Sequence, residues 1–233
     1  MTIIESKEKL KKEGYTWFEL NDFDTKFYSW LLPAKFTKNS NFKERFTFLR
    51  ADGINLSEEQ KIQINKDFGS FEKAEEKKNE VFSILNSLKG NAKSYINQIW
   101  YFTDLDVFLR KSNLNIDDYK MYVKKIIEYY FDKNESDNYR FLSTATLYDK
   151  KCLLTNHSDG IQENRICAIL IYLNEEYDES NGGCLVLNDR EVVTPTFGKV
   201  AIIDLNKFDV PHMVTEVMGG DGRYTLLSFI NKI

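Results

Sequence analysis

The spacing of hydrophobic residues changes near residue 135, and this change predicts two kinds of structure in one chain. Over 116–131 the apolar side chains recur every three or four positions, which is typical of one face of an α-helix. Over 141–148 the period changes to two, and 166–173 is a continuous apolar run typical of a buried strand. The sequence therefore predicts a mainly helical part over 1–135 and a strand-rich part over 136–233.

The helical part contains several shorter predicted elements. A charged helix over 5–13 should end at Gly14, and a strand should follow over 15–20. A second helix should begin at Asn21 or Asp22, bury its aromatic side chains and stop before Pro33. A Phe46–Phe48 alternation predicts another strand, and a capping box at Ser57 and Gln60 predicts a further, polar helix that reaches into 72–80.

The second part contains further strands, which we expect over 184–187, 199–205 and 224–230. Glycine-containing turns separate the strands, as at Asp159-Gly160 and Asn181-Gly182-Gly183. Many short strands with regular turns are typical of a sandwich or a closed jelly roll. The fold class is therefore predicted to be α+β, with a jelly-roll core in the C-terminal half that N-terminal helices pack against and extend.

Composition and charge limit the expected partners and cellular location of the protein. A net charge of −4 and a pI near 5.4 argue against a nucleic-acid partner, which usually requires a basic face. The N-terminus has no apolar signal region, and no apolar run approaches the roughly 20 residues that span a bilayer. The three cysteines, Cys152, Cys167 and Cys184, show no metal-ligand spacing and are expected to be buried free thiols. We expect a cytoplasmic protein without a membrane partner; the oligomeric state stays open.

The chain has only two histidines, and their positions predict a metal site. His157 and Asp159 are two residues apart, so in an extended strand their side chains reach the same face. His212, brought in from a later strand, would add a second imidazole. Two histidines and one carboxylate on one face of an ion leave open positions, an arrangement that suits non-haem Fe(II).

From Tyr148 onwards, the order of these and other features resembles the Fe(II)/2-oxoglutarate-dependent dioxygenases, in particular their prolyl-4-hydroxylase-like branch. The resemblance covers roughly 90 residues, and it depends on the order and spacing of its segments. They are Tyr148, His157-Ser158-Asp159, Arg165, Ile171-Tyr172-Leu173-Asn174, Asn181 to Leu185, Val193 to Val200, Pro211-His212 and Gly222-Arg223-Tyr224-Thr225.

This resemblance implies roles for individual residues. His157, Asp159 and His212 would bind iron. Arg223 would hold the distal carboxylate of 2-oxoglutarate, because a guanidinium meets a carboxylate with two parallel hydrogen bonds. Thr225, Tyr148 and Tyr172 would also contact the co-substrate. Arg165 would lie at the substrate entrance. For Tyr148, Tyr172 and Arg165, an ordinary structural role is an open alternative.

The implied activity is hydroxylation of an aliphatic C–H bond, with Fe(II), 2-oxoglutarate and O2, and with ascorbate as a further candidate. Asp159 favours hydroxylation over halogenation, since halogenating relatives have a small residue at that position. The substrate would be a prolyl residue in a protein or peptide; a free amino acid or another small molecule is the alternative. Two other classes remain: a jelly-roll binding or sensor protein without turnover, and a Zn(II) hydrolase, which Arg223 and the lack of a nearby general base disfavour.

Overall fold

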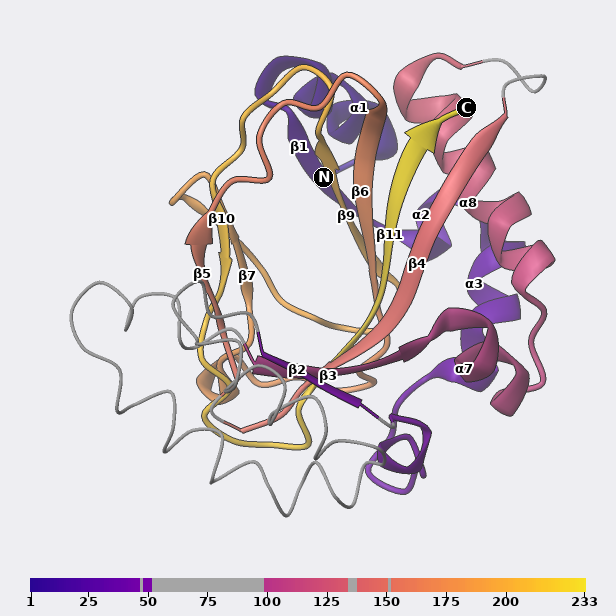
Figure 1. Ribbon diagram of the computed structural model, residues 1–233, viewed down its shortest axis with the longest axis vertical. Coiled ribbons are helices and arrows are strands. Elements are labelled where there is room, and N and C mark those ends of the chain that lie inside the picture. The colour runs from indigo at the N-terminus through magenta and orange to yellow at the C-terminus, as the bar shows by residue number, and fades with distance from the viewer. Residues whose placement is uncertain (47, 52–98, 134–137, 151) are drawn as a thin grey trace, which may run out of the picture.

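Two antiparallel sheets face one another in the computed structural model, which describes residues 1–46, 48–51, 99–133, 138–150 and 152–233 (Figure 1). One sheet has seven strands and the other has four. Helices cover the outer side of the larger sheet (Figure 1). This is the double-stranded β-helix, or jelly roll, that the sequence predicts.

The larger sheet is centred on the strand that comes last in sequence. Its strand order is β1-β9-β6-β11-β4-β3-β2. β11 therefore lies between β6 and β4, and its ladder with β4 runs from the Arg223–Tyr148 pair to the Lys232–Tyr139 pair. The seven strands are β1 (Tyr15–Glu19), β2 (Phe48–Ala51), β3 (Ile99–Asp104), β4 (Tyr139–Tyr148), β6 (Arg165–Tyr172), β9 (Lys199–Asp204) and β11 (Arg223–Lys232).

The smaller sheet consists of short strands in the order β5-β10-β7-β8. They are β5 (Leu154–His157), β7 (Leu185–Leu187), β8 (Glu191–Val193) and β10 (His212–Val214). A polar contact joins this sheet to the edge of the larger one: the Trp17 Nε1–H of β1 donates to the Glu191 carboxylate of β8 over 2.5 Å.

The first 135 residues supply strands of the larger sheet as well as helices. β1 pairs with β9 at one edge, while β3 pairs with β4 and carries β2 at the other edge. The sheet thus extends across the predicted division at residue 135. β2 begins at Phe48, and Phe46 lies before it as a buried side chain.

The helices pack on the large sheet through aromatic side chains. The Tyr130 ring of α8 stacks on Phe18 of β1 with ring centres 5.0 Å apart, and the Tyr119 hydroxyl lies 2.8 Å from that of Ser228 on β11. α8 covers the predicted range 116–131. The helices are α1 (Ile3–Glu13), α2 (Leu20–Phe23), α3 (Thr25–Leu31), α7 (Leu105–Lys111) and α8 (Ile116–Phe131), with short 3-10 turns η1 (Leu32–Ala34), η2 (Lys43–Arg45) and η3 (Glu179–Asn181).

One predicted helix is interrupted. The single helix expected from Asn21 or Asp22 onwards is split into α2 and α3 at Asp24. Asp24 has an extended backbone, and its carboxylate accepts hydrogen bonds from the backbone N–H groups of Lys26 and Phe27. It therefore acts as the N-cap of α3. The predicted helix around Ser57 lies outside the described residues.

Alternation along β11 decides which side chains reach the space between the sheets. Arg223, Thr225, Leu227 and Phe229 line that space, whereas the intervening Ser228 bonds to α8 on the other face. The three cysteines are buried and form no disulfide among the described residues, as predicted. Among the described helices, none has both the length and the apolar character needed to span a bilayer.

Candidate active site

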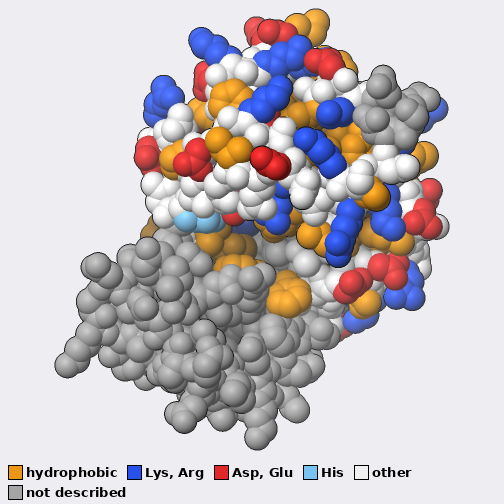
Figure 2. Space-filling model, turned by 45° about the horizontal axis from the view of Figure 1, so that its top comes forward, with side chains coloured by type: hydrophobic (Ala, Val, Ile, Leu, Met, Phe, Trp, Pro, Cys, Tyr) orange, Lys and Arg blue, Asp and Glu red, His pale blue; other side chains and the backbone are white. Residues whose placement is uncertain are grey.

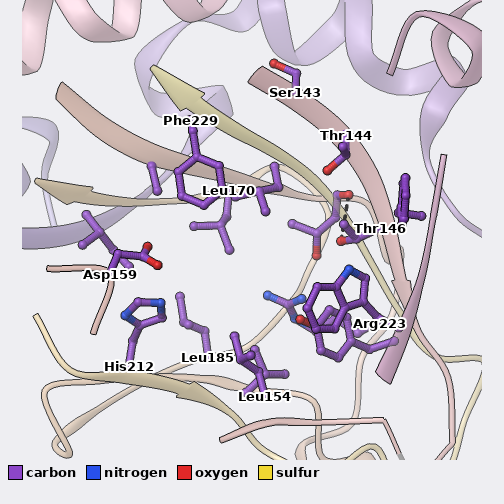
Figure 3. A pocket seen from close by; sticks show the side chains of 18 of the residues that line it. Ser143, Thr144, Thr146, Leu154, Asp159, Leu170, Leu185, His212, Arg223 and Phe229 are labelled. Atoms are coloured by element: carbon purple, nitrogen blue, oxygen red, sulfur yellow. Dashed lines mark hydrogen bonds between the residues drawn. The ribbon is translucent and has the colours of Figure 1, made fainter. Parts of the chain in front are cut away.

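A cavity of about 590 Å³ lies between the two sheets. Side chains of the strands on both sides form its walls, and most of the wall is apolar. Figure 2 shows a histidine side chain beside hydrophobic side chains on one face of the molecule, and Figure 3 shows the interior. The polar groups on the wall include the two histidines, Asp159 and Arg223.

The two histidines and Asp159 meet at one part of this wall. His157, the last residue of β5, pairs directly with His212, the first residue of β10. The ring centres of the two histidines are 4.3 Å apart, and His157 Nε2 lies 3.9 Å from Asp159 Oδ1. One ligand atom from each of the three residues lies within 4.8 Å of the others. The structure therefore brings together the three predicted metal ligands.

Asp159 reaches this group from outside the strand. β5 ends at His157, and Asp159 lies in the segment that follows it. The turn is held by the Gln162 side chain, which donates to the Asp159 carbonyl over 3.0 Å, and by the Ser158 hydroxyl, which accepts from the Gly160 N–H. The two-residue spacing places both side chains on one side of the chain, although only His157 belongs to the strand.

His212 is held in the form that binds metals. Its Nδ1 lies 3.0 Å from the carbonyl oxygen of Val210, so a proton on Nδ1 is donated there and the Nε2 lone pair is left for a metal. Burial lowers the pKa of His212, and the neighbouring His157 acts in the same direction. Both effects favour the neutral imidazole, which is the form that coordinates metals.

Arg223 is the charged group on the opposite side of the cavity (Figure 3). It is 2% exposed, and its guanidinium carbon lies 5.0 Å from the ring centres of both Tyr148 and Tyr172. One terminal nitrogen donates to the Tyr172 hydroxyl over 3.4 Å. Within the described part of the chain, no carboxylate forms an ion pair with Arg223. A buried cation without a counterion is costly, so this side of the cavity favours an anion.

Thr225 adds a second hydrogen-bonding group beside Arg223 on the same face of β11. Its hydroxyl and the Arg223 Nε–H are both buried, and neither has a hydrogen-bond partner in the described structure. Leaving such groups unpaired costs about 1–3 kcal/mol each. A carboxylate placed against them would accept from both, and the residues present therefore fit the distal carboxylate of 2-oxoglutarate.

The two predicted tyrosines have different places at this side of the cavity. Tyr148 lines the cavity and its ring stacks on Trp100 of β3, with centres 5.6 Å apart. Tyr172 lies behind Arg223 and is fully buried. Burial raises the pKa of Tyr172, so its phenol keeps a proton that it can donate while it accepts from Arg223.

Arg165 lies away from the wall but against one of the side chains that form it. Its guanidinium carbon is 4.6 Å from the ring centre of Phe229, a cavity residue at the other end of β11 from Arg223. The Arg165 Nε is buried without a hydrogen-bond partner among the described residues.

Sequence reasoning missed part of the wall. Trp100 and Phe102 of β3 line the cavity, and the strand that carries them was not predicted. The run Ile99-Trp100-Tyr101-Phe102-Thr103, rich in aromatic and β-branched residues, is the signal that could have identified it.

Comparison with known proteins agrees with this geometry. Residues 143–231 match the family model of the 2OG-Fe(II) oxygenase superfamily. No curated protein sequence matches the chain. The chain is similar to the crystal structure of a Pseudomonas putida prolyl-4-hydroxylase, with a TM-score of 0.56 and 15% identity, over 98% of each chain.

Two further prolyl hydroxylase structures show a weaker likeness. One is from Trichoplax adhaerens in complex with a hypoxia inducible factor peptide fragment, with a TM-score of 0.49 and 14% identity over 97% of this chain and 87% of that one. The other is from Phytophthora capsici, with a TM-score of 0.49 and 17% identity over 98% and 62%. Residues 143–231 thus match the 2OG-Fe(II) oxygenase superfamily and contain the grouped His–Asp–His side chains, and the fold of the chain is similar to that of a prolyl-4-hydroxylase.

Proposed function

We propose that the protein is a 2-oxoglutarate-dependent dioxygenase in which His157, Asp159 and His212 bind Fe(II) and Arg223 binds the co-substrate. One observation carries the assignment of the site. A cluster with metal-ligand chemistry and a buried arginine, which has no counterion among the described residues, lie on opposite sides of one cavity (Figure 3). We further propose that residues 1–233 act as a single dioxygenase domain, because strands from both parts of the chain form one sheet.

Bound Fe(II) would supply the oxidation chemistry, in which 2-oxoglutarate, O2 and a substrate C–H bond give succinate, CO2 and a C–OH group. The chain's own residues bind and orient. Two neutral imidazoles and one carboxylate would hold the ion from one side and leave its other positions open. Arg223 and Thr225 would hold the distal carboxylate of 2-oxoglutarate, with Tyr172 steadying the guanidinium and Tyr148 beside it. The apolar wall would keep water out.

Asp159 bears on the outcome of the reaction. Its carboxylate lies within the group of candidate ligand atoms, so it would occupy a position that a halide would otherwise need. We therefore propose hydroxylation rather than halogenation. An Asp159→Gly variant should lose hydroxylation, and chloride transfer by the wild-type protein would contradict the proposal.

For the substrate, we propose a prolyl residue in a protein or peptide, supported by the fold shared with the Pseudomonas putida prolyl-4-hydroxylase. A free amino acid or another small molecule is the alternative. Arg165 would contact the substrate, because it lies against Phe229 with an unpartnered buried Nε. Ascorbate dependence and a cytoplasmic location stay predictions.

The deciding experiment measures succinate formed from 2-oxoglutarate in the presence of Fe(II), O2 and ascorbate. The candidate substrates are proline-containing peptides, free proline and the other free amino acids. Stimulated succinate formation, matched by an equal amount of hydroxylated substrate, is the expected result, and a His157→Ala protein should give neither. If the wild-type protein binds 2-oxoglutarate but forms no succinate, either with any of these substrates or without one, the result favours a non-catalytic binding or sensor protein instead.

A further inference from the structure

Asn174 lies two residues beyond Tyr172, the last residue of β6, and is 2% exposed. In the β6–β11 ladder Thr225 pairs with Tyr172, so continuing the same register by two residues would place Asn174 opposite Arg223. The Asn174 backbone, however, turns away from β11. It forms isolated bridges with Phe36 and Thr196, and its carbonyl accepts from the Phe197 N–H over 2.5 Å. The regular ladder therefore stops at the Thr225–Tyr172 pair, two residues before the Arg223 position.

The side chain of Asn174 forms hydrogen bonds to the backbone of β11 and of the residue before it, where the ladder stops. Its Nδ2 donates to the carbonyl oxygen of Gly222 over 2.8 Å. Its Oδ1 accepts from the backbone N–H of Tyr224 over 2.9 Å. These two backbone groups belong to the residues before and after Arg223. One amide side chain thus holds the backbone on both sides of Arg223, in place of the two hydrogen bonds that a strand neighbour would make.

On the β6 side, the backbone next to Arg223 has one other hydrogen bond among the described residues, from the Leu173 N–H to the Tyr224 carbonyl oxygen over 3.1 Å. The preceding segment contains Gly219, Gly220 and Gly222, and Gly222 has a φ of +91°. A side chain at Gly222 would approach the Tyr148 carbonyl oxygen to 2.9 Å, so the glycine cannot be replaced by a stiffer residue without a shift. The guanidinium itself makes one long hydrogen bond, to Tyr172. The direction of the Arg223 side chain therefore depends on its backbone.

We propose that Asn174 is a positioning residue, which fixes Arg223 for binding of the distal carboxylate of 2-oxoglutarate through its hydrogen bonds to Gly222 and Tyr224. The inference rests on the proposed function, because it assigns Arg223 to the co-substrate. It also predicts different effects on the two sites. Loss of the amide should weaken the anion site more than the metal site, because the three residues of the metal site lie on other elements.

The test compares Asn174→Ala and Asn174→Gln with wild type. The dissociation constant of 2-oxoglutarate is measured by calorimetry on protein loaded with Mn(II), which permits binding without turnover. Asn174→Ala should weaken 2-oxoglutarate binding about tenfold, the effect of roughly one hydrogen bond of moderate strength. Asn174→Gln keeps both the donor and the acceptor on a longer arm and should recover part of the affinity. Mn(II) binding should stay within about twofold of wild type, since no ligand is removed.

A second readout does not depend on the co-substrate. The Tyr224 backbone N–H should exchange with solvent deuterium faster in Asn174→Ala, because its hydrogen-bond acceptor is gone. In the control variant Ser6→Ala it should exchange at the wild-type rate. In steady state with the accepted substrate, the KM for 2-oxoglutarate should rise while kcat at saturation stays within about twofold.

Ser6→Ala is the matched control, since it removes a buried hydrogen bond, to Tyr130, on the helical face of the sheet. It should lower stability without changing the 2-oxoglutarate dissociation constant. An equal loss of affinity in Ser6→Ala would overturn the positioning role, as would wild-type affinity in Asn174→Ala. Arg223→Ala separates the two hypotheses. If it weakens binding and Asn174→Ala does not, only the positioning role fails; if Arg223→Ala binds like wild type, the proposed co-substrate site itself fails.

Discussion

Arg223 and Tyr148 are paired directly across β11 and β4, and the Arg223 guanidinium carbon lies 5.0 Å from the centre of the Tyr148 ring. The ring also stacks on Trp100, so the cation rests on one of a pair of aromatic rings. Aromatic faces attract a cation but cannot neutralise it. The pair therefore orients the guanidinium and leaves its charge for a ligand, which is the basis of the predictions on the co-substrate.

Replacing Arg223 should weaken the binding of 2-oxoglutarate and leave metal binding nearly unchanged. Loss of a buried charge partner costs about 2–5 kcal/mol, so Arg223→Ala should weaken binding roughly 30- to several-thousand-fold. Arg223→Lys keeps the charge without the planar fork and should be intermediate. The measurement is anaerobic titration of 2-oxoglutarate into Fe(II)-loaded protein. Arg190→Ala, which removes an exposed arginine, should behave like wild type.

The Tyr172 hydroxyl should contribute to the same site through Arg223. Tyr172→Phe removes the acceptor of the Arg223 hydrogen bond and keeps the ring, so 2-oxoglutarate should bind about fivefold more weakly, equivalent to about 1 kcal/mol. Tyr119→Phe is the matched control, because it removes a buried hydroxyl of the same kind on the helical face of the sheet. Equal affinities in Tyr172→Phe and wild type would show that the hydroxyl plays no part in binding.

Metal binding should depend on both histidines. Removal of one ligand from three should weaken Fe(II) or Co(II) binding by more than about 100-fold, since changes in the residues that merely support a ligand already cost 10- to 100-fold. Equilibrium dialysis of His212→Ala and His157→Ala tests this, with circular dichroism to verify the fold. Asp178→Asn removes an exposed carboxylate elsewhere and should bind metal normally. Wild-type affinity in both histidine variants would refute the assignment.

Two glycines with left-handed backbones should respond differently to alanine. A Cβ at Gly182 would lie 1.7 Å from the Glu216 carbonyl oxygen, whereas one at Gly160 would meet no atom within 4 Å, although their φ values are +69° and +70°. Gly160→Ala should therefore cost about 1 kcal/mol, from the backbone conformation alone. Gly182→Ala should cost about 3 kcal/mol or more, because the backbone must also move. Urea unfolding measures both, and equal losses would contradict the steric argument.

Several strands and the His157–Asp159 pair could be predicted because they depend on local patterns. Period-two alternation identified β4, and the two-residue spacing of His157 and Asp159 placed both side chains on one side of the chain. The break at Asp24 was hidden, since the aromatic stripe continues through it and only the capping geometry reveals it.

The role of Asn174 could not be predicted from the sequence. Its two partners lie about 50 residues away in the chain, and their backbone groups leave no signal in the residue types. The same is true of Trp100, which stacks on the Tyr148 ring from β3, the strand on the far side of β4 from Arg223. Long-range contacts of this kind appear only once the strand order is known.

The central place of β11 has a consequence for how the protein forms. β11 follows both of its neighbours, β4 and β6, in the chain, so during synthesis those two strands leave the ribosome before the strand that joins them. The sheet must then be completed from its middle, by insertion, and not by growth at an edge. Arg223 and Thr225 arrive with this final strand. The metal ligands can therefore be present in a nascent chain that has no site for the co-substrate, and the ability to bind 2-oxoglutarate would report that the sheet has closed.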